Sequence, residues 1–195
     1  MPKERKGGLK KMVEVRLYDD VNENHAVITS GGAVKIIKNH DYSTHKGHCY
    51  TAKHVWYANP ASAASDILFV TNSTNYVHLW YDFEATSKGE FTVHEDATAT
   101  SAGSTITSYN RNRRNTSEAL SVISYDPGVS SAGTTLTARL LSGIGGSLAG
   151  GGETSIGEYL LKQSTTYLFR FTDKSVTTSD CMIALSWCEG SNEKV

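Results

Sequence analysis

The residues best suited to chemistry gather between positions 40 and 54, where the side chains that can bind a metal ion are His40, His45, His48, Cys49 and His54. Structural zinc sites usually draw their ligands from two separated pairs of such residues. The second pair is missing here, because Cys181 and Cys188 lie far apart on one predicted strand. We therefore expect ordinary loop and strand histidines, no metal and no cofactor, and keep His40, His45 and His48 as the weaker metal-site hypothesis.

Other catalytic patterns are missing from the sequence. The carboxylates Asp82 and Glu84 alternate with apolar residues, which places them on a solvent face, where they favour solubility and protect a sheet edge. No serine has the G-x-S-x-G surroundings of a hydrolase nucleophile. The glycine-rich segment 146–153 lacks the Lys-Ser/Thr ending of a phosphate-binding loop. We expect a protein that is not an enzyme.

Composition limits the remaining possibilities. The chain has 195 residues, 38% of them hydrophobic, and 17 glycines, as expected for one medium β domain with short strands and many turns. The net charge of −1 gives no general reason to expect nucleic-acid binding. No apolar run approaches the roughly 20 residues of a membrane span, and the basic, polar start has no apolar segment typical of a signal peptide. The odd number of cysteines predicts three free thiols, at Cys49, Cys181 and Cys188, in a reducing compartment.

The clearest structural pattern lies between Tyr76 and Arg114. Its first run alternates, with apolar residues at Val77, Leu79, Tyr81 and Phe83 and mostly polar residues between them, which predicts a half-buried strand. A turn at Lys88-Gly89 then leads to a second strand over 90–95. Further strands are predicted over 50–57, 66–71, 104–109, 116–124, 136–141, 158–162, 167–171 and 181–189. These elements predict an antiparallel β-sandwich over 27–190, with a polar tail at 191–195.

Three other segments have a distinct composition. Residues 39–47 are polar and predict a loop, and the glycines of 143–152 predict a second loop without regular structure. The motif SAGSTIT at 101–107 recurs as SAGTTLT at 131–137, an offset of 133 − 103 = 30 residues. Since a solenoid needs about three such units, we interpret the pair as two equivalent hairpin positions in one sandwich.

The first 26 residues predict an extended arm. Basic residues crowd its start, at Lys3, Arg5, Lys6, Lys10 and Lys11, with little to bury. A disordered tail is the usual alternative for such a composition. Val13, Val15 and Leu17 then alternate with charged residues, which is typical of a strand that adds to a neighbour's sheet edge. We expect all eight residues to contact a partner.

The segment 110–114 is an exposed polar turn. It consists of Asn110, Arg111, Asn112, Arg113 and Arg114. No aromatic platform alternates with the arginines, so a nucleic-acid stripe is disfavoured. We interpret the turn as a hydrogen-bonding loop that contacts another subunit.

Several of these features together resemble a family of small tailed-phage virion proteins encoded near capsid genes. The resemblance covers about 47–189 and rests on Asn110, Asn112, Arg113, Gly133-Thr134, Gly145-Gly146, Glu158, Leu161-Lys162, Thr166-Tyr167-Leu168 and Arg170. It implies a capsid decoration, or cement, protein with a single jelly-roll-like sandwich, made in the host cytoplasm and bound to the major capsid protein on the outer surface of the virion. It further implies a homotrimer or homodimer. The long basic arm before Val27 departs from the family pattern.

Two other functions remain as alternatives. A fibre or receptor-binding module for carbohydrate would use exposed aromatics, for which Trp56, Tyr57 and Trp80 are available. Trp80 distinguishes the carbohydrate-binding function from the capsid-binding function, since its side chain stays open to solvent in a sugar-binding module and is covered when it faces a protein partner. A metal-dependent, cupin-like enzyme would use the histidines of 40–54, and fold alone does not decide between these functions.

Overall fold

The computed structural model describes residues 16–19, 24–28, 34–141 and 158–190, with side chains from Ser43 onward. Its contacts divide the chain into two compact units, Met1–Tyr42 and Ser43–Val195. Within the described residues the structure is nearly all β, and no helix there is long and apolar enough to cross a membrane.

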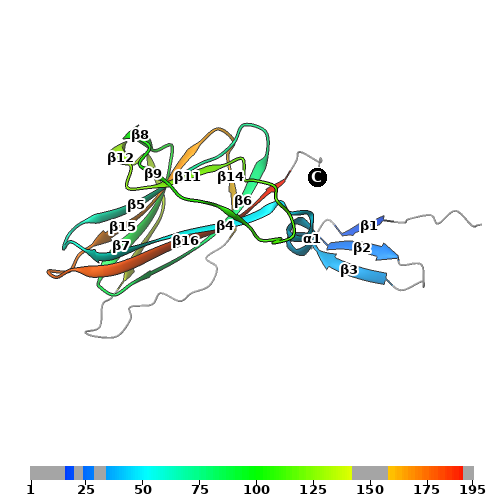
Figure 1. The fold of residues 1–195 in the computed structure, drawn as a ribbon, viewed down its shortest axis with the longest axis horizontal. Coiled ribbons are helices and arrows are strands. Elements are labelled where there is room, and N and C mark those ends of the chain that lie inside the picture. Colours follow the sequence, from blue (N-terminus) through cyan, green and yellow to red (C-terminus); the bar gives the residue numbers. More distant parts are fainter. Residues whose placement is uncertain (1–15, 20–23, 29–33, 142–157, 191–195) are drawn as a thin grey trace, which may run out of the picture. The chain divides into compact units, whose positions relative to one another are not determined.

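The first unit contains a three-stranded antiparallel sheet. Its strands are β1 (Arg16–Asp19), β2 (Asn24–Ile28) and β3 (Val34–Lys38), in that order (Figure 1). Leu17 pairs with Ala26 in this sheet, so the predicted strand around Leu17 is present, while Val13 and Val15 lie outside the described residues. Strands β2 and β3 belong to the same compact unit as β1, whereas the sequence pattern predicted that residues 27–38 belong to the sandwich.

The second unit is a β-sandwich, which confirms the predicted fold class. One sheet has five strands in the order β10 (Tyr109–Asn110), β4 (Cys49–Asn59), β16 (Ser179–Gly190), β6 (Tyr76–Ala85) and β14 (Tyr159–Leu161). The other has six, in the order β13 (Thr134–Leu141), β7 (Gly89–Glu95), β15 (Thr166–Asp173), β5 (Ala64–Val70), β11 (Val122–Tyr125) and β9 (Ser104–Thr105). The jelly-roll connectivity stays a prediction.

The alternating patterns define the core between the sheets. On β6, Val77, Leu79, Tyr81 and Phe83 are buried, as predicted. Phe83 stacks on Phe91 of the opposite sheet, with 4.0 Å between ring centroids. Because these side chains come from facing sheets, they join the two layers into one hydrophobic core.

A small third layer explains the continuously apolar run of β5. Strands β8 (Thr98–Ser101) and β12 (Gly128–Ser131) pair with each other on the outside of the six-stranded sheet. Ala97, just before β8, and Val129 of β12 pack on the outward-facing Leu68 and its neighbour Leu168. Strand β5 is therefore buried on both faces, which removes the need for alternation.

The repeated SAG motifs lie at equivalent positions, as predicted. The first turn connects β8 to β9, at one edge of the six-stranded sheet, and the second connects β12 to β13, at the opposite edge. The pairing is reciprocal, because β9 pairs with β11, which precedes the second motif, and β13 pairs with β7, which precedes the first.

Three local predictions are wrong. Residues 39–46 form helix α1 (Asn39–Lys46) instead of a loop. The strand predicted over 116–124 is confined to β11, from Val122, because the segment before it is held by side-chain hydrogen bonds described below. The strand predicted over 104–109 is interrupted, since β9 pairs with one sheet and β10 with the other.

Candidate binding site

The predicted polar turn lies against the C-terminal end of helix α1. This helix ends in a Schellman motif, in which His48 N–H donates to the Ser43 carbonyl and Gly47 N–H donates to the Thr44 carbonyl, both at 3.0 Å. Gly47 has φ of 79°, as the motif requires. The carbonyls that follow are left for side chains to satisfy.

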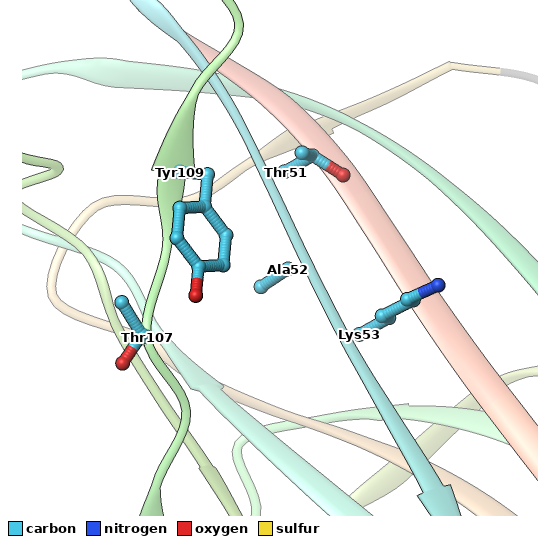
Figure 2. Close-up of a pocket in the computed structure, with 5 residues that line it drawn as sticks. All are labelled: Thr51, Ala52, Lys53, Thr107 and Tyr109. Carbon is cyan, nitrogen blue, oxygen red and sulfur yellow. The ribbon is translucent and has the colours of Figure 1, made fainter.

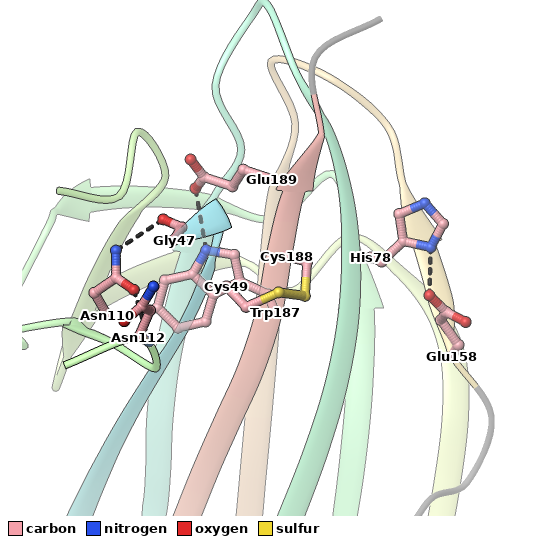
Figure 3. Close-up of a disulfide and its surroundings, with 9 residues drawn as sticks. All are labelled: Gly47, Cys49, His78, Asn110, Asn112, Glu158, Trp187, Cys188 and Glu189. Carbon is pink, nitrogen blue, oxygen red and sulfur yellow. Dashed lines mark hydrogen bonds and ion pairs between the residues drawn. A yellow bond between two sulfur atoms is a disulfide. The ribbon is translucent and has the colours of Figure 1, made fainter. Parts of the chain in front are cut away.

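Three asparagine amides from the turn satisfy those carbonyls. Asn112 Nδ2 donates to the His45 carbonyl at 2.8 Å, and Asn115 Nδ2 donates to the Lys46 carbonyl at 3.1 Å. Asn110 Nδ2 donates to the Gly47 carbonyl at 2.8 Å (Figure 3). Residues distant in sequence thus cap the helix, which explains why a polar segment with weak helix formers is helical.

The other end of each amide fixes the turn itself. Asn110 Oδ1 accepts from Asn112 N–H at 2.9 Å, and Asn112 Oδ1 accepts from Arg114 N–H at 3.1 Å. Asn115 Oδ1 accepts from Ser117 N–H at 2.8 Å. Because both ends of the amides are used, the turn is a rigid platform held by its own chain.

The arginine side chains of the turn are exposed on this platform. Arg111, Arg113 and Arg114 are all exposed, and the Arg113 guanidinium lies 5.6 Å from the centroid of the Tyr109 ring. The asparagines predicted to contact another subunit therefore hold the turn together, and the arginine side chains lie at its exposed surface. Contact of this turn with another subunit stays a prediction.

A disulfide joins the two strands beneath the turn, so the prediction of three free thiols is wrong. Cys49 and Cys188 face each other across β4 and β16, and their sulfurs are bonded (Figure 3). Cys181 and Cys188 cannot pair with each other, because both lie on the continuous strand β16 and are too far apart along it. Cys181 remains a free thiol, buried and donating to Ser65 Oγ at 3.2 Å, and burial raises its pKa to about 11.

Two carboxylates near the disulfide also have partners within the chain. Glu189 accepts from Leu120 N–H at 2.8 Å, from Ser121 N–H at 2.9 Å and from Trp187 Nε1–H at 3.0 Å. It thereby holds the segment between the turn and β11 against β16. Toward the opposite edge of the five-stranded sheet, where β6 pairs with β14, the Glu158 carboxylate forms a hydrogen bond with His78 Nδ1 (Figure 3).

The remaining polar clusters are structural. Arg170 forms a two-point ion pair with Asp66, with both N···O distances at 2.7 Å. Burial acts to raise the pKa of Asp173, but hydrogen bonds from Ser179, Ser175 and Ser87 outweigh it and lower that pKa. These groups stabilise turns and strands, and the partners of the Ser87, Ser175 and Ser179 hydroxyls within the described residues are the Asp173 carboxylate and the Thr177 carbonyl.

The histidines of the proposed metal site do not assemble with other ligands in the described part of the chain. His45 and His48 are exposed, and the side chain of His40 lies outside the described residues. Cys49 is in a disulfide, and His54 stacks on Tyr125 with 3.7 Å between ring centroids. Within the residues described, no group of three or more histidines, cysteines or carboxylates is placed to hold a metal ion.

The aromatic residues proposed for carbohydrate binding are dispersed. Trp56 is buried and donates from Nε1 to Asp126 at 2.8 Å. Trp80 is half-buried on the outer face of β6, and only Tyr57, with 78% of its surface exposed, is open. Tyr109 is also exposed, and its only signal in the sequence is its position beside the basic turn.

The residues assigned to partner contact in the arm lie mostly beyond the described structure. Lys3, Arg5, Lys6, Lys10, Lys11, Val13 and Val15 are outside the described residues, and Leu17 is described only as part of the β1 backbone. Their contacts stay predictions.

No known protein family, curated protein or solved structure matches this chain. A rigid turn that presents three exposed arginines on a disulfide-linked sheet is suited to binding carboxylates or other anions by charge and hydrogen bonding.

Proposed function

We propose that the protein is a virion structural protein, a decoration or cement protein that binds the outer surface of a phage shell built from the major capsid protein. One observation carries the proposal: the chain has a separate three-stranded unit at its start, distinct from the sandwich. The resemblance in the sandwich sequence supplies the class of partner.

The size of the N-terminal unit favours a role in assembly. Its three strands have four, five and five residues. A sheet of this size can bury only a small apolar surface, so packing against another surface would add to its stability. In the proposal that surface belongs to the shell or to a neighbouring copy, and the basic residues ahead of β1 attract an acidic partner.

The polar groups of the sandwich suit a structural role. Buried carboxylates and asparagines in the described residues serve caps and turns, which yields a rigid body. Many copies of such a body on one shell make individually weak contacts effective through multivalency. The proposal includes a jelly-roll connectivity and self-association as a trimer or dimer.

The test is co-sedimentation with undecorated shells. Full-length protein is compared with a truncated chain of residues 39–195, which keeps α1 and its asparagine caps and removes β1, β2 and β3 together. We expect the truncated protein to fold and to lose most of its occupancy on the shells. The double variant Lys10→Glu, Lys11→Glu should lose part of it, and added salt should act in the same direction if these contacts are exposed.

Two outcomes would count against the proposal. Equal binding by the full-length and truncated chains would show that the N-terminal unit does not attach the protein to the shell. Absence of binding by the full-length protein to shells at any salt concentration would remove the capsid as the partner.

A further inference from the structure

Strand β4 has a long edge without a strand partner. Over its 11 residues it pairs with β16, but on its other side β10 pairs only with Tyr50 and Thr51. From Lys53 to Tyr57, no other strand in the described part of the chain pairs with this edge. Backbone groups on such an edge are available to another chain.

The direction of the free backbone groups follows from the pairing. Arg111 N–H donates to the Cys49 carbonyl on the β10 side, whereas Glu189 N–H donates to the His48 carbonyl on the β16 side. In an antiparallel sheet the backbone groups of successive residues alternate between the two neighbours. The N–H and C=O groups of Lys53, Val55 and Tyr57 therefore point to the free edge, over about 13 Å.

A groove lies beside the start of this edge. It has a volume of about 420 Å³ and is lined by Thr51, Ala52, Lys53, Thr107 and Tyr109. Figure 2 shows Thr107 and Tyr109 on the neighbouring segment, across an open space from β4. The Tyr109 ring and the Ala52 methyl give this space apolar walls, which suits a side chain of an added strand.

The charge around the groove is basic. Lys53 is exposed in its wall, and the segment 109–118 carries three arginines and one carboxylate, Glu118. At the other end of the edge lie two carboxylates, Asp126, which accepts from Trp56, and Asp180, which accepts from the Ala58 N–H at 2.8 Å. The basic side chains are concentrated at the Tyr109 end, where a bound segment meets a net positive charge.

We propose that the edge Lys53–Tyr57 and its groove bind an extended, acidic segment of a partner protein by β-strand addition. The backbone of the segment pairs with Lys53, Val55 and Tyr57, and its carboxylates lie near Lys53 and the arginines of the turn. The inference does not depend on the capsid proposal, because it concerns the chemistry of the bound segment and not its source.

The charges disfavour residues 1–11 of the chain as the occupant, and they also disfavour unselective pairing. Residues 1–11 carry five lysines and arginines against one glutamate, so a copy of this segment would place like charges together. A lysine on an exposed edge discourages pairing with neutral or basic strands. The same lysine favours a strand that brings a carboxylate to it.

The experiment uses the isotopically labelled full-length protein and short synthetic peptides. The probe is a blocked peptide of alternating glutamate and valine, compared with a lysine–valine peptide and with the acidic peptide N-methylated at every second residue. We expect only the first to bind, with slowed hydrogen exchange at the amides of Lys53, Val55 and Tyr57. N-methylation removes the N–H groups that strand pairing needs.

Matched charge reversals complete the test. Lys53→Glu should weaken binding of the acidic peptide by more than about tenfold, whereas Lys88→Glu, an equal charge change at the exposed β6–β7 turn, should have little effect. The proposal is overturned if the acidic peptide leaves the three amides unprotected, if the N-methylated peptide binds equally well, or if the two variants weaken binding to the same extent.

Discussion

Gly103 and Gly133 occupy equivalent positions in the two SAG turns. Gly103 lies against the backbone at the end of β11, and Gly133 lies against the backbone at the end of β7. A Cβ at Gly103 would lie 2.2 Å from the Tyr125 carbonyl oxygen, and one at Gly133 would lie 2.1 Å from the Glu95 carbonyl oxygen. Both have positive φ, 77° and 80°. The sequence repeat therefore reflects a reciprocal arrangement. The first turn contacts β11 and continues into β9, which pairs with β11, and the second turn contacts β7 and continues into β13, which pairs with β7.

Replacement of either glycine by alanine should destabilise the sandwich. The added methyl group meets a backbone carbonyl that cannot move freely, and the left-handed conformation adds strain, so we expect a loss of about 2–4 kcal/mol each. Gly190→Ala is the matched control, because nothing lies within 4 Å of its Cβ position. Urea unfolding of the three variants measures the effect. Similar midpoints for Gly133→Ala and Gly190→Ala would contradict the close approach.

The disulfide gives a prediction about thiol content and stability. Denatured, non-reduced protein should show one reactive thiol, Cys181, and three after reduction. Because the bond closes a loop of 139 residues in sequence separation, its loss should lower the free energy of unfolding by about 2–5 kcal/mol. The double variant Cys49→Ser, Cys188→Ser should unfold at the same urea concentration with or without reductant. Three titratable thiols before reduction would show that the bond does not form.

The sequence predicted the elements that depend on local periodicity. The alternation of Val77, Leu79, Tyr81 and Phe83 identified the buried face of β6, and the apolar run at 66–71 identified the buried strand β5. The repeat identified two equivalent turns. These signals lie within one segment, so they can be read without knowledge of the rest of the chain.

The features that the sequence did not reveal depend on long-range partners. Helix α1 is capped by Asn112 and Asn115, which lie more than sixty positions away in the sequence. The polar composition of residues 39–47 does not record these partners, and on its own it predicted a loop. Cys49 and Cys188 meet only because β4 and β16 pair in that register. The open edge of β4 likewise follows from where β10 stops, which no local pattern in β4 records.

The asparagine platform can be tested with a nearly isosteric change. Asn110→Asp replaces a donor to the Gly47 and Ser117 carbonyls with a charged acceptor, which leaves those groups facing negative charge. We expect a loss of about 3 kcal/mol or more in the free energy of unfolding. Arg114→Gln, at an exposed side chain of the same turn, should change it by less than about 0.5 kcal/mol. Equal stability of the two variants in thermal unfolding would refute the capping role.

The last prediction concerns pH and His94, which is buried and bonded to Thr92 and Thr135. Burial and the nearby positive charge of Arg170 lower the pKa of His94, against opposing effects of Asp66 and Glu90. The pKa of a histidine in the unfolded chain is about 6.5. Below that pH the unfolded chain therefore binds a proton at position 94 that the folded chain does not, and the free energy of unfolding falls as the pH drops. His54, whose pKa burial also lowers, adds to this loss. Urea unfolding at about pH 7.5 and about pH 5.5 should show a smaller decrease for His94→Gln than for the wild type. The exposed-site variant His48→Gln should behave like the wild type, and an unchanged decrease in His94→Gln would rule out His94 as a source of acid sensitivity.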